Sequence, residues 1–448
     1  MDRESPQLRR AINFPHATAM VVGIIIGASI FVQPSEITGR VPSITGIFLV
    51  WAFSGMLTMF GALVCAELAS TFTRSGGVYV YLSEAFSPAV GFLWGWAMFW
   101  SMHSGIIAAI SVIFARYTAY FLPLTDAQIK GVAIAAILLV SAVNYIGVKQ
   151  GSTLQTLFTA GKLIAIAGIV ACGFIYGSRL PNHFVAGDLD PGRGISTNGF
   201  LLAMVAGLFA FGGWHMVTYN SEETRDPQKI IPRALVVGTV IVTACYLALN
   251  AVYMYVLPLS TVASSTRIAA DAADALFGFG GGVIMSALVV FSTFGGLSGI
   301  ILCGPRVYYA MAQDGLLFRW AGAIHPRYRT PHRAILLQAA WSSALVATGT
   351  YRTLFTRVVY TEWIFFGLMA IGLILVRRRP GAAPGYRMWG YPVTPALFII
   401  SSFAIVMNQV ISSPGESFFG LALVLIGLPV YYFGAKRHNE RSTQSASH

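Results

Sequence analysis

Two apolar stretches decide the fold of this chain. The first is VVGIIIGASIFVQPSE, residues 21–36, and the second is LLAMVAGLFAFGGWHMVTYNSEE, residues 201–223. Each is apolar enough to lie in a membrane-spanning helix, yet small residues interrupt its middle: the run 27–29 in the first and the pair 212–213 in the second. Unwinding a helix there leaves backbone N–H and C=O groups unpaired in a medium that cannot hydrogen-bond them.

The two interruptions fall in the first and the sixth expected helices of the chain. Each opens a block of five apolar runs, and glycine-interrupted spans at matching positions of two halves point to the ligand site of an inverted-repeat transporter. The alternative is that these glycines only allow helices to pack closely. The paired placement favours a ligand site.

Composition places the rest of the chain in a membrane. Of 448 residues, 56% are AVILMFWYC and only 10% are Asp, Glu, Lys or Arg, against about 25% charged residues in soluble proteins. The 30 phenylalanines and 9 tryptophans exclude intrinsic disorder. The apolar runs are continuous rather than alternating, which predicts helices and not a barrel.

Counting these runs predicts an all-α polytopic membrane protein with twelve transmembrane helices. Their expected spans are 14–38, 43–70, 88–121, 129–147, 154–177, 198–220, 234–257, 282–311, 334–350, 354–376, 393–411 and 417–435. The resulting organisation is a tail at 1–13, a first inverted repeat at 14–177, a second at 198–376, two further helices at 393–435 and a tail at 436–448. A short surface helix is expected in the outer connection 258–281.

The net charge of +12 comes from short basic clusters between apolar runs. Such clusters are typical of topology determinants, not of a nucleic-acid surface. With the N-terminus inside, about twenty basic residues lie on inner segments and about six on outer loops. This predicts a multi-pass protein of the plasma or inner membrane with both termini cytoplasmic.

The four cysteines lie within apolar runs, without metal-ligand spacing, and no cofactor is implied.

Several stretches, in order along the chain, resemble one family. They include GIIIGASIF at 23–31, AELASTFTRSGGVYVYLSEAF at 66–86, FAFGGW at 209–214 and SEETRDPQKIIPRA at 221–234. The chain resembles the amino acid–polyamine–organocation (APC) superfamily, and within it the L-type amino acid transporters. The resemblance covers about residues 14–436 and implies a LeuT-type fold of two inverted five-helix repeats plus two helices.

The resemblance also implies which residues bind substrate. Gly27, Ala28, Ser29 and Ile30 would contact its carboxylate. The residues implied to receive the ammonium or line the side-chain pocket are Ile25, Ile26, Phe209, Ala210, Phe211, Gly212, Gly213, Phe294 and Ser298. Phe209 and Trp214 would act as aromatic gates. The family motif is usually G-S-G-I-F, so Ser29 stands where glycine is usual.

Lys162 is the second signal, because a lysine in mid-membrane needs a partner or a cavity. It is expected near the start of the fifth helix. The family places this lysine where sodium-coupled relatives bind an ion, which implies sodium-independent coupling. The alternative is a lysine that snorkels to the inner face.

Other charged residues are expected at the ends of helices. Two acids, Glu67 and Glu84, flank the inner loop that contains Arg74, and the sixth span is followed by Glu222, Glu223 and Arg225. Ion pairs among these charges could hold an inner gate closed, although ordinary interfacial charges fit equally well. Glu362 and Arg116 lie nearer outer ends and could be solvated.

Together these features predict sodium-independent transport of neutral, medium to large L-amino acids, as an exchanger. A proton-coupled symporter, or a transporter of cationic amino acids or polyamines, remains an alternative. An enzyme is not expected, since HExxH and GxSxG motifs are missing from the sequence. The expected partners are a small amino acid and the lipid bilayer. The loop 123–128 has no cysteine, so no disulfide-linked ancillary subunit is expected.

Overall fold

The computed structural model describes residues 7–27, 29–177, 196–265, 267–278, 280–350, 359–381 and 384–433. In these ranges the chain is helical apart from its connections and one bridge between Ile12 and Thr224. Ten helical segments in the same ranges are long and apolar enough to cross a membrane. The predicted all-helical membrane architecture is confirmed.

The count of twelve spans stays a prediction. The ninth and tenth expected spans are α15 (His332–Thr348) and α17 (Thr361–Arg377), and each has 17 residues. That length is at the short limit for crossing a bilayer.

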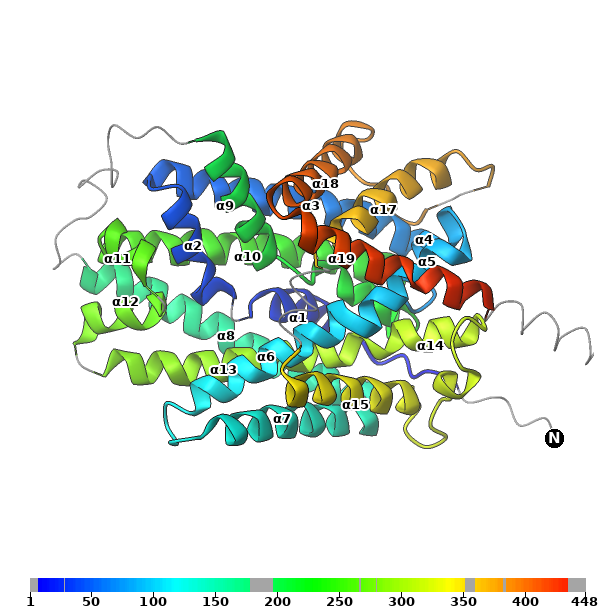
Figure 1. Cartoon of the computed structure of the whole chain (residues 1–448), viewed down its shortest axis with the longest axis horizontal. Helices are drawn as coiled ribbons and strands as arrows, with labels where there is room; N and C mark the ends of the chain where they lie inside the picture. The colour runs from blue at the N-terminus through cyan, green and yellow to red at the C-terminus, as the bar shows by residue number, and fades with distance from the viewer. Residues whose placement is uncertain are drawn as a thin grey trace, which may run out of the picture.

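The first five expected spans contain both continuous and interrupted helices (Figure 1). They comprise α1 (Phe14–Ile25) with η1 (Ser29–Phe31) and α2 (Gln33–Arg40); α3 (Ile44–Thr71); α5 (Pro88–Ala97) with η2 (Met98–Met102) and α6 (His103–Thr118); α7 (Asp126–Ile146); and α8 (Val148–Gly177).

The next five repeat this pattern and two more helices follow. They comprise α9 (Thr197–Ala210) with η3 (Trp214–Glu223), α10 (Pro227–Val256), α13 (Gly281–Cys303) with α14 (Pro305–Gln313), α15 and α17, and then α18 (Val393–Ser412) and α19 (Pro414–Leu425). The short connecting helices are α4 (Val78–Ala85), α11 (Leu259–Ser264), α12 (Ile268–Phe277) and η4 (Arg319–Gly322).

Local sequence explains where these helices begin. Proline opens α5, α10, α14 and α19, as expected where the first N–H groups of a helix have no partner within it. At α7 the Thr125 hydroxyl oxygen accepts a hydrogen bond from the backbone N–H of Gln128. The side-chain oxygen of Gln128 accepts one from the backbone N–H of Thr125. The predicted short helix in the outer connection is α12.

The boundary between the fourth and fifth spans differs from the prediction. Only Gly147 separates α7 from α8, so α8 begins at Val148. Lys162 is therefore near the middle of α8, and its expected position near the helix start was wrong. A count of apolar residues misses the first turns of α8, because these contain Lys149, Gln150 and Ser152.

The helix α1 lies within the bundle and is packed against α8, α10 and α13 (Figure 1). Glycines allow this close approach. A Cβ added to Gly23 would lie 2.0 Å from Oγ1 of Thr159, and one added to Gly299 would lie 2.5 Å from Cγ1 of Ile24. Small residues at such crossings let membrane helices pack backbone to backbone. Gly23 and Gly299, which lie outside the two interruptions, therefore serve helix packing.

A buried ion pair attaches the C-terminal end of η3 to α14. Arg306, on α14, donates from Nε and Nη2 to the two carboxylate oxygens of Glu223, at 2.7 and 2.8 Å. Both side chains are fully buried. Asn220 donates to the same carboxylate at 2.8 Å, so the charges are paired and hydrogen-bonded as burial requires.

We predict that Arg306→Ala strongly destabilises the protein. It removes the cation and leaves the Glu223 carboxylate buried, which costs about 3–5 kcal/mol for a pair of this kind. Thermal unfolding of the purified variant in detergent should begin well below that of the wild type. Arg319→Ala, at an exposed position, is the matched control; equal loss in both variants would contradict the proposed importance of the pair.

Candidate substrate site at two interrupted helices

The break in the first span lies at residues 26–28. The helix α1 ends at Ile25, the N–H of Gly27 turns back to donate to the C=O of Ile25 at 2.8 Å, and η1 starts at Ser29. Ala28 lies outside the described residues. Since the first N–H groups of a helix have no partner within it, the start of η1 is a place where an anion can bind.

Lys162 satisfies carbonyl groups on the other side of this break. Its Nζ donates to the C=O of Gly23 at 2.9 Å and to the C=O of Ile26 at 2.8 Å. The side chain is 2% exposed. Lys162 therefore does not snorkel to the surface; its ammonium replaces backbone donors that the interrupted helix no longer supplies.

The hydroxyl of Tyr246, on α10, joins the two interrupted helices. It lies 2.9 Å from the C=O of Ile25 and 2.9 Å from the C=O of Ala210. Because a phenol has one proton, it can donate to only one of these carbonyls at a time. Tyr246 could not be identified from the sequence, since one tyrosine in an apolar run carries no distinctive signal.

The second break lies between α9 and η3. The N–H of Gly212 donates to the C=O of Phe209 at 3.1 Å, and Gly213 has a φ of 94°. This left-handed conformation favours glycine. A Cβ at Gly213 would also lie 2.5 Å from Cγ2 of Ile24, whereas one at Gly212 would meet only the C=O of Phe209, at 3.2 Å.

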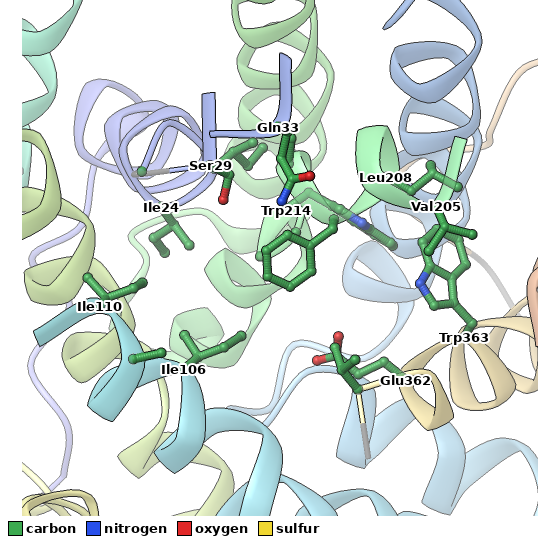
Figure 2. A pocket seen from close by; sticks show the side chains of 18 of the residues that line it. Ile24, Ser29, Gln33, Ile106, Ile110, Val205, Leu208, Trp214, Glu362 and Trp363 are labelled. Atoms are coloured by element: carbon green, nitrogen blue, oxygen red, sulfur yellow. The ribbon is translucent and has the colours of Figure 1, made fainter. Parts of the chain in front are cut away.

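A cavity of about 260 Å³ lies between the two breaks. Figure 2 shows side chains from several helices turned toward it. Gly27 and Ser29 line it from one break, and Gly212 and Gly213 line it from the other. Ile106 and its neighbours on α6 form an apolar wall. Backbone groups at one end and apolar side chains at the other suit a ligand with a polar head group.

The structure brings together many of the predicted site residues. Those that line the cavity are Ile25, Gly27, Ser29, Phe209, Ala210, Gly212, Gly213 and Trp214. Phe209 is 40% exposed, so the aromatic ring proposed as a gate borders open space. Trp214 is buried and its ring packs against Phe366.

Five predicted binding residues do not line the cavity. Phe211 is 1% exposed and packs on Tyr246; Phe294 packs between helices against Phe158. The prediction that these two rings line the pocket was wrong, because both fill space between helices. The others are Ile26, whose carbonyl accepts from Lys162, Ile30 and Ser298.

Glu362 is half-buried and lies in the first turn of α17. Its side chain lines the cavity beside Trp363 instead of facing the outer surface of the bundle. The sequence places Glu362 near a helix end but does not show which face of that helix borders a cavity.

The expected gate charges pair in part as predicted. Arg74 lies 3.7 Å from Glu84, which flanks the same loop, but its shorter contact is with Asp314, at 2.6 Å. Glu67 binds Arg377, at 2.6 Å between Oε1 and Nε, and not Arg74. Both pairs connect segments that are far apart in the sequence, which is why spacing alone did not identify them.

Glu222 and Arg225 differ in their contacts. The carboxylate of Glu222 accepts from the backbone N–H of Ser75 at 3.1 Å, which ties η3 to the loop before α4. Arg225 forms no ion pair within the described part of the chain. Its backbone N–H donates to the C=O of Ile12, so its contribution there is structural.

Comparison with known proteins shows the family of this chain. Residues 12–429 match the family model described as Amino acid permease. The chain belongs to the amino acid permease family. It is 31% identical to the serine/threonine exchanger SteT of Bacillus subtilis, over 98% of this chain and 99% of that protein. It is 29% identical to the human b(0,+)-type amino acid transporter 1, over 96% and 88%.

A third relative is the large neutral amino acids transporter small subunit 2 of Oryctolagus cuniculus, 30% identical over 95% of this chain and 81% of that protein. The resemblance to the APC superfamily and its L-type members is confirmed. An amino acid permease of this architecture is a multi-pass membrane transporter with a LeuT-type fold, not an enzyme.

We predict that two neighbouring glycines respond differently to substitution. Gly213→Ala requires an unfavourable φ and pushes a Cβ into Ile24, so it should reduce both the folded yield and transport at least tenfold. Gly212→Ala places its Cβ 3.2 Å from the carbonyl oxygen of Phe209, a contact that a shift of a few tenths of an ångström relieves, and should fold. Size-exclusion profiles and transport by reconstituted protein measure both effects. Equal folding and transport by the two variants would contradict the proposed geometry of the break.

Proposed function

We propose that this permease exchanges neutral, medium to large L-amino acids across a cell membrane, without sodium, by alternating access. The observation that carries the proposal is the cavity between two interrupted helices. The start of η1 presents N–H groups for a carboxylate. The carbonyl oxygens at the ends of α1 and α9 can accept a second hydrogen bond, beside those from Lys162 and Tyr246, from an ammonium. The head group shared by all α-amino acids fits both requirements.

The side-chain end of the cavity supports neutral substrates. Ile106 and Ile110 on α6, with Leu208 on α9, give it apolar surface. Gly212 contributes no side chain, which leaves room for a large substrate. Burial of apolar groups of this kind contributes about 25 cal/mol per Å² removed from water.

Independence from sodium is proposed because Lys162 already holds a positive charge against the break. Exchange is proposed because of the L-type resemblance, and one relative is named an exchanger. Another relative is named a transporter of large neutral amino acids, which supports the proposed substrates. Proton-coupled symport remains the competing mechanism, since a buried lysine can release its proton.

We further propose that the chain works without a disulfide-linked subunit. Its four cysteines, Cys65, Cys172, Cys245 and Cys303, all lie within helices. The two charged tails are proposed to be cytoplasmic, in line with the excess of basic residues on the same side.

A counterflow experiment tests the proposed substrates. The purified chain alone, in liposomes loaded with leucine, should take up external labelled leucine and phenylalanine well above protein-free liposomes. Amines that lack the carboxylate should compete at least tenfold more weakly than the parent amino acids, because they cannot use the N–H groups at the start of η1. Failure of leucine and phenylalanine to exchange, or full competition by the amines, would contradict the proposal.

We predict that Lys162→Ala slows transport more than it weakens binding. The variant leaves the carbonyls of Gly23 and Ile26 without their donor, which removes the link between α8 and the break in α1. Turnover should fall at least tenfold, while the equilibrium Kd for leucine changes by about threefold or less. Lys149→Ala, on the same helix at an exposed position, is the control. A loss of binding as large as the loss of turnover would contradict this role.

A further inference from the structure

A second cavity, of about 430 Å³, lies at the end of the bundle that holds the N-terminal segment. None of the described residues that line it also lines the cavity at the two breaks. Figure 1 shows the N-terminal segment, at the blue end of the colour scale, running beside α14. The lining includes Leu8 and Arg10 on this segment, Glu222 near the end of η3, Tyr309 and Gln313 on α14, and Ile324 after η4.

Arg10 and Glu222 bring opposite charges to this second cavity without forming an ion pair. Within the described part of the chain, no ion pair includes either residue. Burial opposes the charge on Glu222, whereas the N–H of Ser75 and the cations of Arg74 and Arg10 favour it. Arg74 is already bound to Asp314. Arg10 thus acts on Glu222 across a gap, and such a gap suits a ligand that carries both charges.

Backbone hydrogen bonds hold the two charged residues next to each other. The N–H groups of Ala11 and Ile12 both donate to the C=O of Glu223, each at 2.9 Å. Arg10 directly precedes this pairing in the N-terminal segment, and Glu222 directly precedes it in η3. The two charges are therefore in place before a ligand arrives, which reduces the ordering cost of binding.

The remaining lining residues provide hydrogen-bonding groups and an apolar surface. Nε2 of Gln313 donates to the C=O of Gly322 at 3.0 Å, which leaves the amide oxygen of Gln313 as an acceptor for a ligand. The hydroxyl of Tyr309 belongs to a group that can donate or accept. Leu8 and Ile324 add apolar surface to the same cavity. The second cavity thus combines two opposite charges, a neutral acceptor and an apolar surface.

We propose that this second cavity binds a free α-amino acid. The guanidinium of Arg10 forms charge-assisted hydrogen bonds with the ligand carboxylate. The carboxylate of Glu222 accepts from the ligand ammonium, and the amide oxygen of Gln313 is a second acceptor. An aliphatic side chain contacts Leu8 and Ile324. A ligand with only one of the two charges leaves Arg10 or Glu222 without a partner.

The proposed second site is separate from the transport cavity and goes beyond the proposed function. Its location on the cytoplasmic face rests on the proposed orientation of the chain, with the N-terminus inside. An amino acid bound there connects the N-terminal segment to η3 and α14. The site would therefore be filled according to the amino acid concentration on that side of the membrane.

Photolabelling of the purified full-length chain tests the proposal. Photo-leucine, a leucine analogue that carries a diazirine, is irradiated with the protein, and the labelled peptides are identified by mass spectrometry. The wild type should carry label on peptides that contain Leu8 or Ile324, and excess leucine should prevent it. Isopentylamine and isocaproate each carry one of the two charges of leucine. Each should compete at least about tenfold more weakly, because a hydrogen bond to a charged group is lost.

Two substitutions remove one charge each from the second cavity. In Arg10→Gln and in Glu222→Gln, label on the peptides of the second cavity should fall at least about tenfold, for the same reason. The amide in Glu222→Gln can still accept from the N–H of Ser75, so the fold is kept. Arg10→Lys keeps the charge and should retain most of the label. Arg9→Gln is the matched control, because Arg9 is exposed and does not line the cavity; its label should equal that of the wild type.

Three results would overturn the proposal. They are no label near Leu8 or Ile324 in the wild type, equal label in Arg10→Gln and Arg9→Gln, and full competition by isopentylamine or isocaproate. The last result would show a site for a single charge. Leucine counterflow in the same preparation separates this proposal from the proposed function. Label at the second cavity without counterflow contradicts only the proposed function, and counterflow without that label contradicts only the second site.

Discussion

The contact between the Lys162 ammonium and the carbonyls of Gly23 and Ile26 supports the whole site. A helix can be interrupted in a bilayer only if its freed backbone groups find partners. Lys162 provides donors to α1, and Tyr246 provides one that alternates between Ile25 and Ala210. These donors leave the second lone pair of a carbonyl such as that of Ala210, and the N–H groups at the start of η1, for a ligand.

Two ion pairs on the predicted cytoplasmic side differ in how easily their partners can separate. The side chains of Arg74 and Asp314 are 48% and 31% exposed, and exposed pairs contribute only about 0–1 kcal/mol. Arg306 and Glu223 are fully buried, so their separation would leave two charges unpaired. We therefore expect η3 and α14 to move together during transport, whereas the contact between Arg74 and Asp314 opens.

The sequence predicted the architecture and both breaks because apolar length and glycine position are local properties. It also identified Lys162, since a lysine in an apolar run requires a partner. It did not predict that Phe211 and Phe294 pack between helices, because the direction of a side chain next to a break depends on the path of the backbone there. The pairs Glu67–Arg377 and Arg74–Asp314, and the position of Glu362 on the cavity wall, depend on contacts between distant segments.

We propose that the ammonium of Lys162 occupies the place between α1 and α13 where a coupling cation would otherwise bind. Its Nζ would lie 3.9 Å from a Cβ added at Gly296 on α13, and a second cation so close would be strongly repelled. The most direct test is leucine counterflow by the wild-type protein with sodium replaced by choline on both sides of the membrane. Equal rates and equal apparent affinities in the two salts are predicted; transport that requires sodium would contradict the account.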